Sequence, residues 1–153
     1  MAAGAAAAAA VIALSAAPVG SSATVQPFGA RETLSDAGGA AVTAYTVTNL
    51  RPSSDRIPWP VMGRLYEATV TVEAERGTVT PILPMFNARA ASGQTFRVLA
   101  NVATPQGVSP ATLMQGGKST GKIYFDVTGE TPNSVVYNNG VTDLLVWVGQ
   151  RAG

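Results

Sequence analysis

The chain has 153 residues, ten Lys and Arg against nine Asp and Glu, and a formal net charge of +1. This length predicts one domain, and the scattered charges exclude both the basic stripe of a nucleic-acid-binding protein and a basic amphipathic helix for membrane surfaces. The sequence contains neither His nor Cys. Its core must therefore provide the stability without disulfides, and no side chain has an unperturbed pKa suited to proton transfer near neutrality.

The N-terminal segment has the features of a secretory signal. The Ala-rich run from Ala5 to Leu14 is too short and too weakly hydrophobic for a clear bilayer span, and Ser21-Ser22-Ala23 fits a small-x-Ala cleavage pattern. We therefore expect a signal peptide over residues 1–23 and one domain over residues 24–153, giving a secreted, extracellular monomer without stable membrane insertion. The first basic residue is only Arg31, so an uncleaved anchor and a disordered tail on a cytosolic protein stay as alternatives.

The middle of the chain alternates between apolar and polar residues. In the run from Leu65 to Arg76, one face carries Tyr66, Ala68, Val70, Val72 and Ala74, and the other carries Glu67, Thr69, Thr71, Glu73 and Glu75. This period of two predicts a strand with one buried face and one solvated face. The Thr- and Val-rich segment from Ala41 to Leu50 predicts a similar strand, with Tyr45 and Val47 pointing inward.

Two more alternating runs follow towards the C-terminus, one with Ile123, Phe125 and Val127 and one with Leu144, Val146 and Val148. Turn sequences separate the strand-like segments. Ser92-Gly93 and Asn138-Asn139-Gly140 each supply a glycine for the positive φ of a short hairpin loop. From the alternation we expect a core between two sheets made of Tyr66, Val70, Val72, Ile123, Phe125, Val127, Leu144 and Val146.

Prolines interrupt the run from Thr80 to Arg89 at Pro81 and Pro84. Because proline cannot donate to a β-ladder, we expect this run to be an edge strand or a bulged one. Seven or eight short strands with local connections predict an all-β fold, an antiparallel β-sandwich of two sheets.

Several short sequences near Ser119 resemble catalytic or phosphate-binding motifs, but each lacks a residue or a structural element that the motif requires. Gly117 to Gly121 spells the Gly-x-Ser-x-Gly elbow of serine hydrolases, which needs a His and a following helix where a strand is expected here. Ser119-x-x-Lys122 spells a motif of penicillin-interacting enzymes, but residues three apart on a strand point to opposite faces. Gly117-Lys118-Ser119 resembles the end of a phosphate-binding loop, but that motif requires glycine at position 112, which is Thr in this chain. We interpret the segment as a Gly- and Ser-rich loop that enters a strand.

Acidic residues are the other candidates for chemistry. Glu67, Glu73 and Glu75 share one strand face, an arrangement that suits a metal site or acid–base work on sugars. We instead expect solvated charges on a polar face, paired with Arg64 and Arg76, because that face alternates with the apolar one.

The remaining polar and aromatic candidates also have structural explanations. Asp126 alternates with inward residues and is expected to point outward. Trp59 and Trp147 are expected to be core or edge-covering aromatics rather than platforms for carbohydrate stacking. We therefore predict no catalytic residue, no metal site and no cofactor.

Several stretches across the chain match the sequence of a known protein family. They are Tyr66–Thr69, Gly77–Pro81, Phe86–Arg89, Gly93, Arg97–Leu99, Gln115-Gly116, Ser119–Gly129, Asn138–Gly140, Asp143–Leu145 and Trp147. In these stretches the chain closely resembles the small secreted immunogenic proteins of mycobacteria, a family found as culture-filtrate antigens. The resemblance implies an immunoglobulin-like β-sandwich without disulfides, exported and recognised by host antibodies, and it brings no catalytic residue to transfer.

Two classes of function stay open from the sequence. The first is a non-enzymatic interaction module that binds a protein partner, at the cell exterior or the host interface, through loops or an exposed sheet face. The alternative is a carrier of a small apolar ligand or lipid between the two sheets. A hydrolytic enzyme is disfavoured because His and Cys are missing, and we predict that the protein is not an enzyme.

Overall fold

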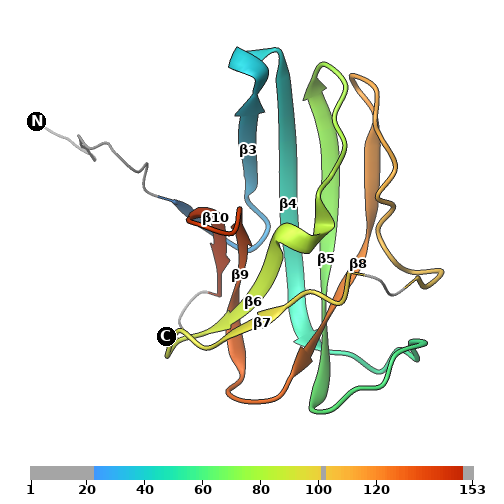
Figure 1. Cartoon of the computed structure of the whole chain (residues 1–153), viewed down its shortest axis with the longest axis vertical. Coiled ribbons are helices and arrows are strands. Elements are labelled where there is room, and N and C mark those ends of the chain that lie inside the picture. Colours follow the sequence, from blue (N-terminus) through green and yellow to red (C-terminus); the bar gives the residue numbers. More distant parts are fainter. Residues whose placement is uncertain (1–22, 101–102, 150–153) are drawn as a thin grey trace, which may run out of the picture.

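The structure, a computed structural model, describes residues 23–100 and 103–149 as two β-sheets packed face to face (Figure 1). The predicted all-β, immunoglobulin-like sandwich is thus confirmed. Apart from Ala23, the expected signal peptide lies outside these residues. The described part also contains two one-turn 3-10 helices, η2 (Ala37–Gly39) and η3 (Leu83–Met85), and no helix there is long and apolar enough to span a membrane.

The first sheet has four antiparallel strands that are rich in Thr and Val. Side chains branched at Cβ favour strands because they pack well on a pleated surface. Val47 lies opposite Val70, and Val70 lies opposite Gly121 on the next strand. The order across the sheet is β3 (Arg31–Asp36), β4 (Ala41–Pro52), β5 (Arg64–Arg76) and β8 (Lys118–Val127).

The second sheet has five strands. Their order is β2 (Thr24–Pro27), β10 (Asp143–Val148), β9 (Pro132–Asn138), β6 (Phe86–Ala90) and β7 (Thr95–Arg97). All neighbours are antiparallel except β2 and β10, which run parallel and depart from the purely antiparallel sheets expected. The chain also crosses between the sheets, so that β8 pairs with β5 and β9 with β6. The local connections expected from the sequence are therefore wrong for these pairs.

Aromatic and β-branched side chains fill the space between the sheets. Phe86, Phe125 and Trp147 are fully buried, and the Phe86 ring contacts Tyr45 and Tyr137 edge-on, at centroid distances of 5.4 and 5.1 Å. The predicted inward positions on β4, β5 and β8 are confirmed as one cluster, comprising Tyr45, Val47, Tyr66, Val70, Val72, Ile123, Phe125 and Val127.

The prediction for the last strand is wrong by one residue. Leu145 and Trp147 point into the core, whereas Val146 pairs with Val136 on the outer face of the sheet, and Leu144 is half-buried. The register shifts between Asp143 and Leu145. Residues 144–148 are also all apolar, so the sequence alternation contains no information on which set faces inward.

The proline-rich run is not one edge strand. Pro81 and Pro84 precede β6 in an irregular segment that includes η3, and β6 itself pairs with strands on both sides. The expected irregularity is present, because the β6–β9 register shifts between Arg89 and Ala90. Both prolines thus lie outside the strands, where no backbone N–H has to be donated to a β-ladder.

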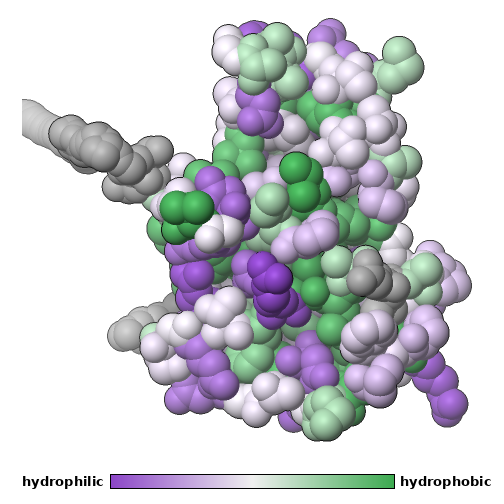
Figure 2. All heavy atoms as spheres, in the orientation of Figure 1, coloured by the Kyte–Doolittle hydropathy of each residue, from purple (hydrophilic) through white to green (hydrophobic). Residues whose placement is uncertain are grey.

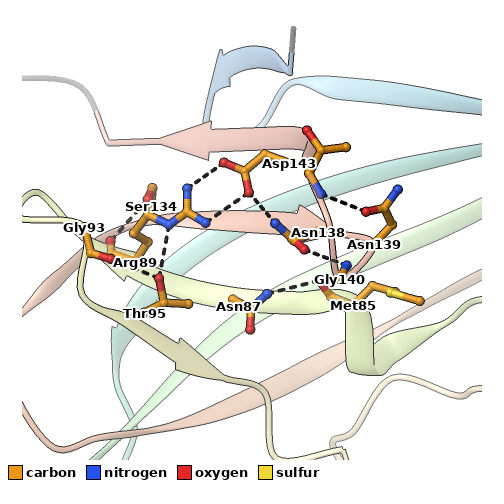
Figure 3. Close-up of polar contacts among 11 residues, drawn as sticks. Met85, Asn87, Arg89, Gly93, Thr95, Ser134, Asn138, Asn139, Gly140 and Asp143 are labelled. Atoms are coloured by element: carbon orange, nitrogen blue, oxygen red, sulfur yellow. Dashed lines mark hydrogen bonds and ion pairs between the residues drawn. The ribbon is translucent and has the colours of Figure 1, made fainter. Parts of the chain in front are cut away.

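An ion pair joins three strands on the outer face of the five-stranded sheet (Figure 3). The Arg89 guanidinium of β6 donates two hydrogen bonds to the Asp143 carboxylate of β10, at 2.7 and 3.0 Å. Asn138 of β9 donates a third to the same carboxylate at 2.7 Å. Arg89 holds the pKa of Asp143 below its ordinary value. The three strands are thus connected by side chains as well as by the backbone ladder.

The two flanks of the sandwich close differently. On one flank, Val98 bridges to Phe125 and the Leu99 N–H donates to the Tyr124 carbonyl at 2.8 Å, so the chain after β7 joins the edge of β8. On the other, the Trp147 indole N–H donates to the Ala30 carbonyl at 2.8 Å. That bond connects β10 to the turn before β3.

The corrected register of β10 gives a testable contrast between adjacent leucines. Leu145→Ala should lower the free energy of unfolding by about 2–5 kcal/mol, because it leaves a cavity in the core. Leu144→Ala, the matched control, should cost at least about 1 kcal/mol less, because its side chain is only half-buried. Denaturant unfolding of both variants measures the difference, and a larger cost at Leu144 would contradict the register.

Candidate binding groove

An apolar groove lies on the flank where the chain after β7 joins β8. The segment just before β6 forms one wall, the loop between β7 and β8 forms the other, and the volume is about 530 Å³. Figure 2 shows apolar surface gathered on this face of the molecule. The lining consists of Pro81, Ile82, Leu83, Pro84, Ala100, Ala103, Thr104, Gly107, Val108, Ser109 and Pro110.

The groove has the chemistry of a site for uncharged, apolar groups. Among the described residues that line it, none is ionisable, and the only polar side chains are two hydroxyls, on Thr104 and Ser109. Ile82 exposes 46% of its surface, a high value for a large aliphatic side chain. The volume falls within the range of about 300–1,000 Å³ that is typical of small-molecule sites.

Backbone hydrogen bonds to β8 position one wall of the groove. The Lys122 N–H donates to the Gln106 carbonyl at 2.8 Å, and the Val108 N–H donates to the Lys122 carbonyl at 3.0 Å. This close approach requires glycine at position 121, because a Cβ there would lie 2.5 Å from the Val108 Cα. The wall is therefore an extension of the β8 edge.

The side chain of Lys122 lies in a polar network on the outer face of the same sheet. Its ammonium donates to the Asp55 carboxylate at 2.8 Å and to the Glu67 carboxylate at 3.1 Å. The Tyr124 hydroxyl donates to Asp55 at 2.7 Å. The network thus fixes the loop after β4, which carries Asp55, to β5 and β8.

Glu67 is the most buried member of the network. Its side chain is 3% exposed, and besides Lys122 it accepts hydrogen bonds from the Ser53 hydroxyl at 2.7 Å and from the Arg51 guanidinium at 3.3 Å. A buried carboxylate is tolerated only when its oxygens are paired in this way.

The pKa shifts in the network follow from its hydrogen bonds and burial. The Lys122 ammonium lowers the pKa of Asp55, chiefly by donating a hydrogen bond to it, and Asp55 in turn raises the pKa of Lys122. Burial raises the pKa of Tyr124. All three shifts favour an ionised Asp55–Lys122 pair beside a neutral tyrosine, an arrangement suited to holding structure rather than to transferring protons.

The groove and the network meet at a small cavity of about 30 Å³. It shares Leu83 and Val108 with the groove, and Lys122 and Tyr124 with the network. The outer-face ion pairs therefore hold the strand on which the groove wall rests.

The catalytic look-alikes do not assemble into a site. Lys122 is bonded to two carboxylates rather than to Ser119, which agrees with our rejection of the Ser-x-x-Lys motif. Asp126 points outward as expected, and its carboxylate accepts the N–H groups of Met62 and Gly63 at 2.8 and 2.7 Å. Within the described residues, no cluster of three or more acidic side chains has the arrangement of a metal site.

The prediction for the glutamates of β5 needs correction. The outer face is right, but Glu67 is buried beneath the loop after β4 rather than solvated. The expected partners Arg64 and Arg76 are also wrong. Arg31 of β3 pairs with Glu73 and Glu75 instead, at 3.6 and 2.6 Å.

The tryptophans divide between core and surface. Trp147 is fully buried, as expected for a core aromatic, and Trp59 exposes 45% of its surface in the loop between β4 and β5. Neither the groove nor the part that Asp55 and Ser53 play in the network was predicted from the sequence. For the network, the one signal in the sequence was the polar Ser-Ser-Asp loop, because the partners come from three separate segments.

Comparisons with known proteins now identify the family. Residues 23–147 match the family described as "Domain of unknown function (DUF1942)". The immunogenic proteins MPB63 of Mycobacterium bovis and MPT63 of Mycobacterium tuberculosis are each 50% identical to the chain over 121 residues, covering 78% of this chain and 76% of theirs. The chain belongs to this mycobacterial family of secreted immunogenic proteins.

The family fold is also known from experiment. The crystal structure of MPT63, a secreted protein of Mycobacterium tuberculosis, matches with a TM-score of 0.81 and 46% identity, covering 84% of this chain and 99% of MPT63. The resemblance and the fold predicted from the sequence of this DUF1942 protein are both confirmed.

Glu67 and Glu75 allow a matched test of the network in this family member. Glu67→Ala should lower the free energy of unfolding by about 1–3 kcal/mol, because it removes the buried carboxylate that accepts hydrogen bonds from Lys122, Ser53 and Arg51. Glu75→Ala removes the same residue type from the same strand, but its ion pair is exposed and should be worth less than about 1 kcal/mol. Equal losses in denaturant unfolding would show that the Glu67 network is not a stabilising feature.

Proposed function

We propose that this protein is an exported, non-enzymatic binding module that engages an apolar group of its partner in the groove. The observation that carries the proposal is the groove itself, which is open and apolar. Its walls are held by the β8 edge and by the segment before β6. A partner protein that offers an exposed aliphatic or aromatic side chain fits this chemistry.

The positions of the acidic residues support binding rather than catalysis. Glu67, Asp55 and Asp143 are engaged in ion pairs, and Asp126 accepts two backbone hydrogen bonds. No carboxylate is among the described residues that line the groove. A general acid or base would have to lie within hydrogen-bond reach of a bound substrate, and the polar side chains of that described lining are the hydroxyls of Thr104 and Ser109.

The filled core favours an interaction module over a carrier that holds its ligand between the sheets. Phe86, Phe125 and Trp147 occupy the centre of the sandwich and are fully buried. The groove instead lies at the flank, where a partner reaches it without separating the sheets. A small apolar ligand stays as the second candidate occupant, because the volume of about 530 Å³ suits one.

Binding at the groove is tested with a neutral apolar dye such as Nile red. The dye should brighten on binding, and Ile82→Asp should weaken binding at least about tenfold, because it places a charge in the apolar wall. The matched control is Met114→Asp, which changes an exposed apolar side chain outside the groove lining and should leave the affinity unchanged. No binding by the parent protein, or equal loss in both variants, would contradict the proposal.

We also propose cleavage after Ala23, and the start of strand β2 at Thr24 supports this boundary. Expression of the full chain in a mycobacterial host should release a species that begins at Thr24, as read by intact mass. Ala23→Arg should block the release, because signal peptidase sites require a small residue before the cut. Finding only full-length, membrane-bound protein would argue for an anchor instead.

A further inference from the structure

Glu32 is a buried carboxyl group without a partner. It lies on β3, exposes 4% of its surface, and neither carboxyl oxygen has a hydrogen-bond partner among residues 23–100 and 103–149. Native proteins rarely leave a buried polar group in this condition, because its desolvation is then uncompensated. The groove and the polar network make no use of it, so it needs a separate explanation.

The strand pattern places Glu32 inward. Arg31 and Thr33 are exposed on the outer face, where Arg31 pairs with Glu73 and Glu75, whereas Glu32 lies opposite the buried Tyr45 of β4. Burial is the only resolved cause of its pKa shift, which points to no nearby compensating charge.

The charged and titratable groups on the elements around Glu32 offer it no ion pair. Arg31 of β3 pairs with Glu73 and Glu75, and Arg51 of β4 pairs with Glu67, all on the outer face of the sheet. The others are Tyr45 of β4, Tyr137 of β9 and Asp36 at the far end of β3. On β10, Asp143 is bonded to Arg89 on the outer face of its sheet, and neither β2 nor η2 carries an ionisable side chain. Ionised Glu32 would therefore be an isolated buried charge.

The strand that carries Glu32 is attached along one side. In the described part of the chain, β3 pairs with β4 and has no partner on its other edge. Two hydrogen bonds secure the turn before it, from the Gly29 N–H to the Val47 carbonyl and from the Trp147 indole to the Ala30 carbonyl, both at 2.8 Å. The strand can therefore open without disturbing any other strand pair.

We propose that β3 is a pH-sensitive flap that closes over the flank of the core while Glu32 is protonated and opens more readily once Glu32 ionises. Opening breaks the Trp147–Ala30 hydrogen bond and brings water to the carboxylate. It also uncovers the apolar flank around Tyr45 and Trp147. Strands β3 and β8 are the two opposite edges of the four-stranded sheet, and the flap does not depend on the proposed binding function.

The direction follows from the effect of burial on a carboxyl group. Burial raises the pKa of Glu32 from 4.5 to about 7. For a raised carboxyl pKa, the stability of the closed strand is fully present below pH 4.5 and is lost as the pH rises through about 7. The same two values make opening about 30-fold more favourable at pH 8.5 than at pH 5.5.

Amide hydrogen exchange on the full domain reads this opening strand by strand. After correction for the intrinsic exchange rate, the protection factors of amides in the β3–β4 ladder should fall about 30-fold between pH 5.5 and 8.5. Amides of the central strand β9, which exchange only through global unfolding, should have higher protection factors than the β3–β4 amides at both pH values. Equal protection factors in β3 and β9 would mean that β3 exchanges only through global unfolding and would overturn the flap.

Two variants separate Glu32 from other acids. Glu32→Gln keeps the shape but cannot ionise, so its β3 protection should not depend on pH. Asp36→Asn, on the same strand but exposed, should keep the full pH dependence. If Glu32→Gln behaves like the parent protein, the proposal fails.

A direct titration of Glu32 in the parent protein tests the proposal even if the Glu32→Gln variant does not fold. Carbon-13 NMR of the Glu32 carboxyl in the parent protein should give a pKa about 2 to 3 units above that of an exposed glutamate. An ordinary pKa would overturn the proposal without recourse to any variant.

Discussion

Phe86 lies at the centre of an aromatic layer that connects the two sheets. Its ring contacts Tyr45 from the four-stranded sheet and Tyr137 from its own sheet edge-on, and lies 6.4 Å from the Trp147 ring. Edge-to-face pairs add attraction beyond the burial of area. Because the chain contains no cysteine, this layer takes the place that a disulfide has in antibody domains. The register of every strand around it must bring these rings together.

Each edge of the two sheets is protected in a different way. The loop between β7 and β8 forms backbone hydrogen bonds along the free edge of β8. The residues directly after β7 also bridge to β8, so the edge strands of the two sheets protect each other. Strand β2 has four residues and ends with Pro27, which lacks an N–H. Strand β3 carries the inward Glu32. Short strands, proline and inward-pointing ionisable residues are known means of preventing edge-to-edge aggregation, and an exported protein without disulfides has particular need of them.

The sequence predicted the strands with strict alternation but failed where both faces are apolar. On β5, Val70 and Val72 alternate with threonine and glutamate, so period two identifies the inward face. On β10, apolar residues occupy both faces, and the register shifts near Asp143. The sequence pattern therefore does not show which of two neighbouring residues points into the core.

The site was less predictable than the fold. Glu67 has the alternation of a solvated residue, and only the loop that carries Ser53 and Asp55 buries it. The groove arises where two irregular segments meet, and irregular segments have no period to detect. Gly121 was the one sequence signal beside it, since its lack of a Cβ permits the close approach of Val108.

The Arg89–Asp143 pair has a consequence for immune recognition. It brings together residues 54 positions apart in the chain, with Asn138 between them in space (Figure 3). Both charged side chains are 28% exposed, so an antibody whose footprint covers them contacts three strands at once. Such an epitope is discontinuous and is lost when the domain unfolds. Sera raised against short linear peptides would not contain antibodies to it.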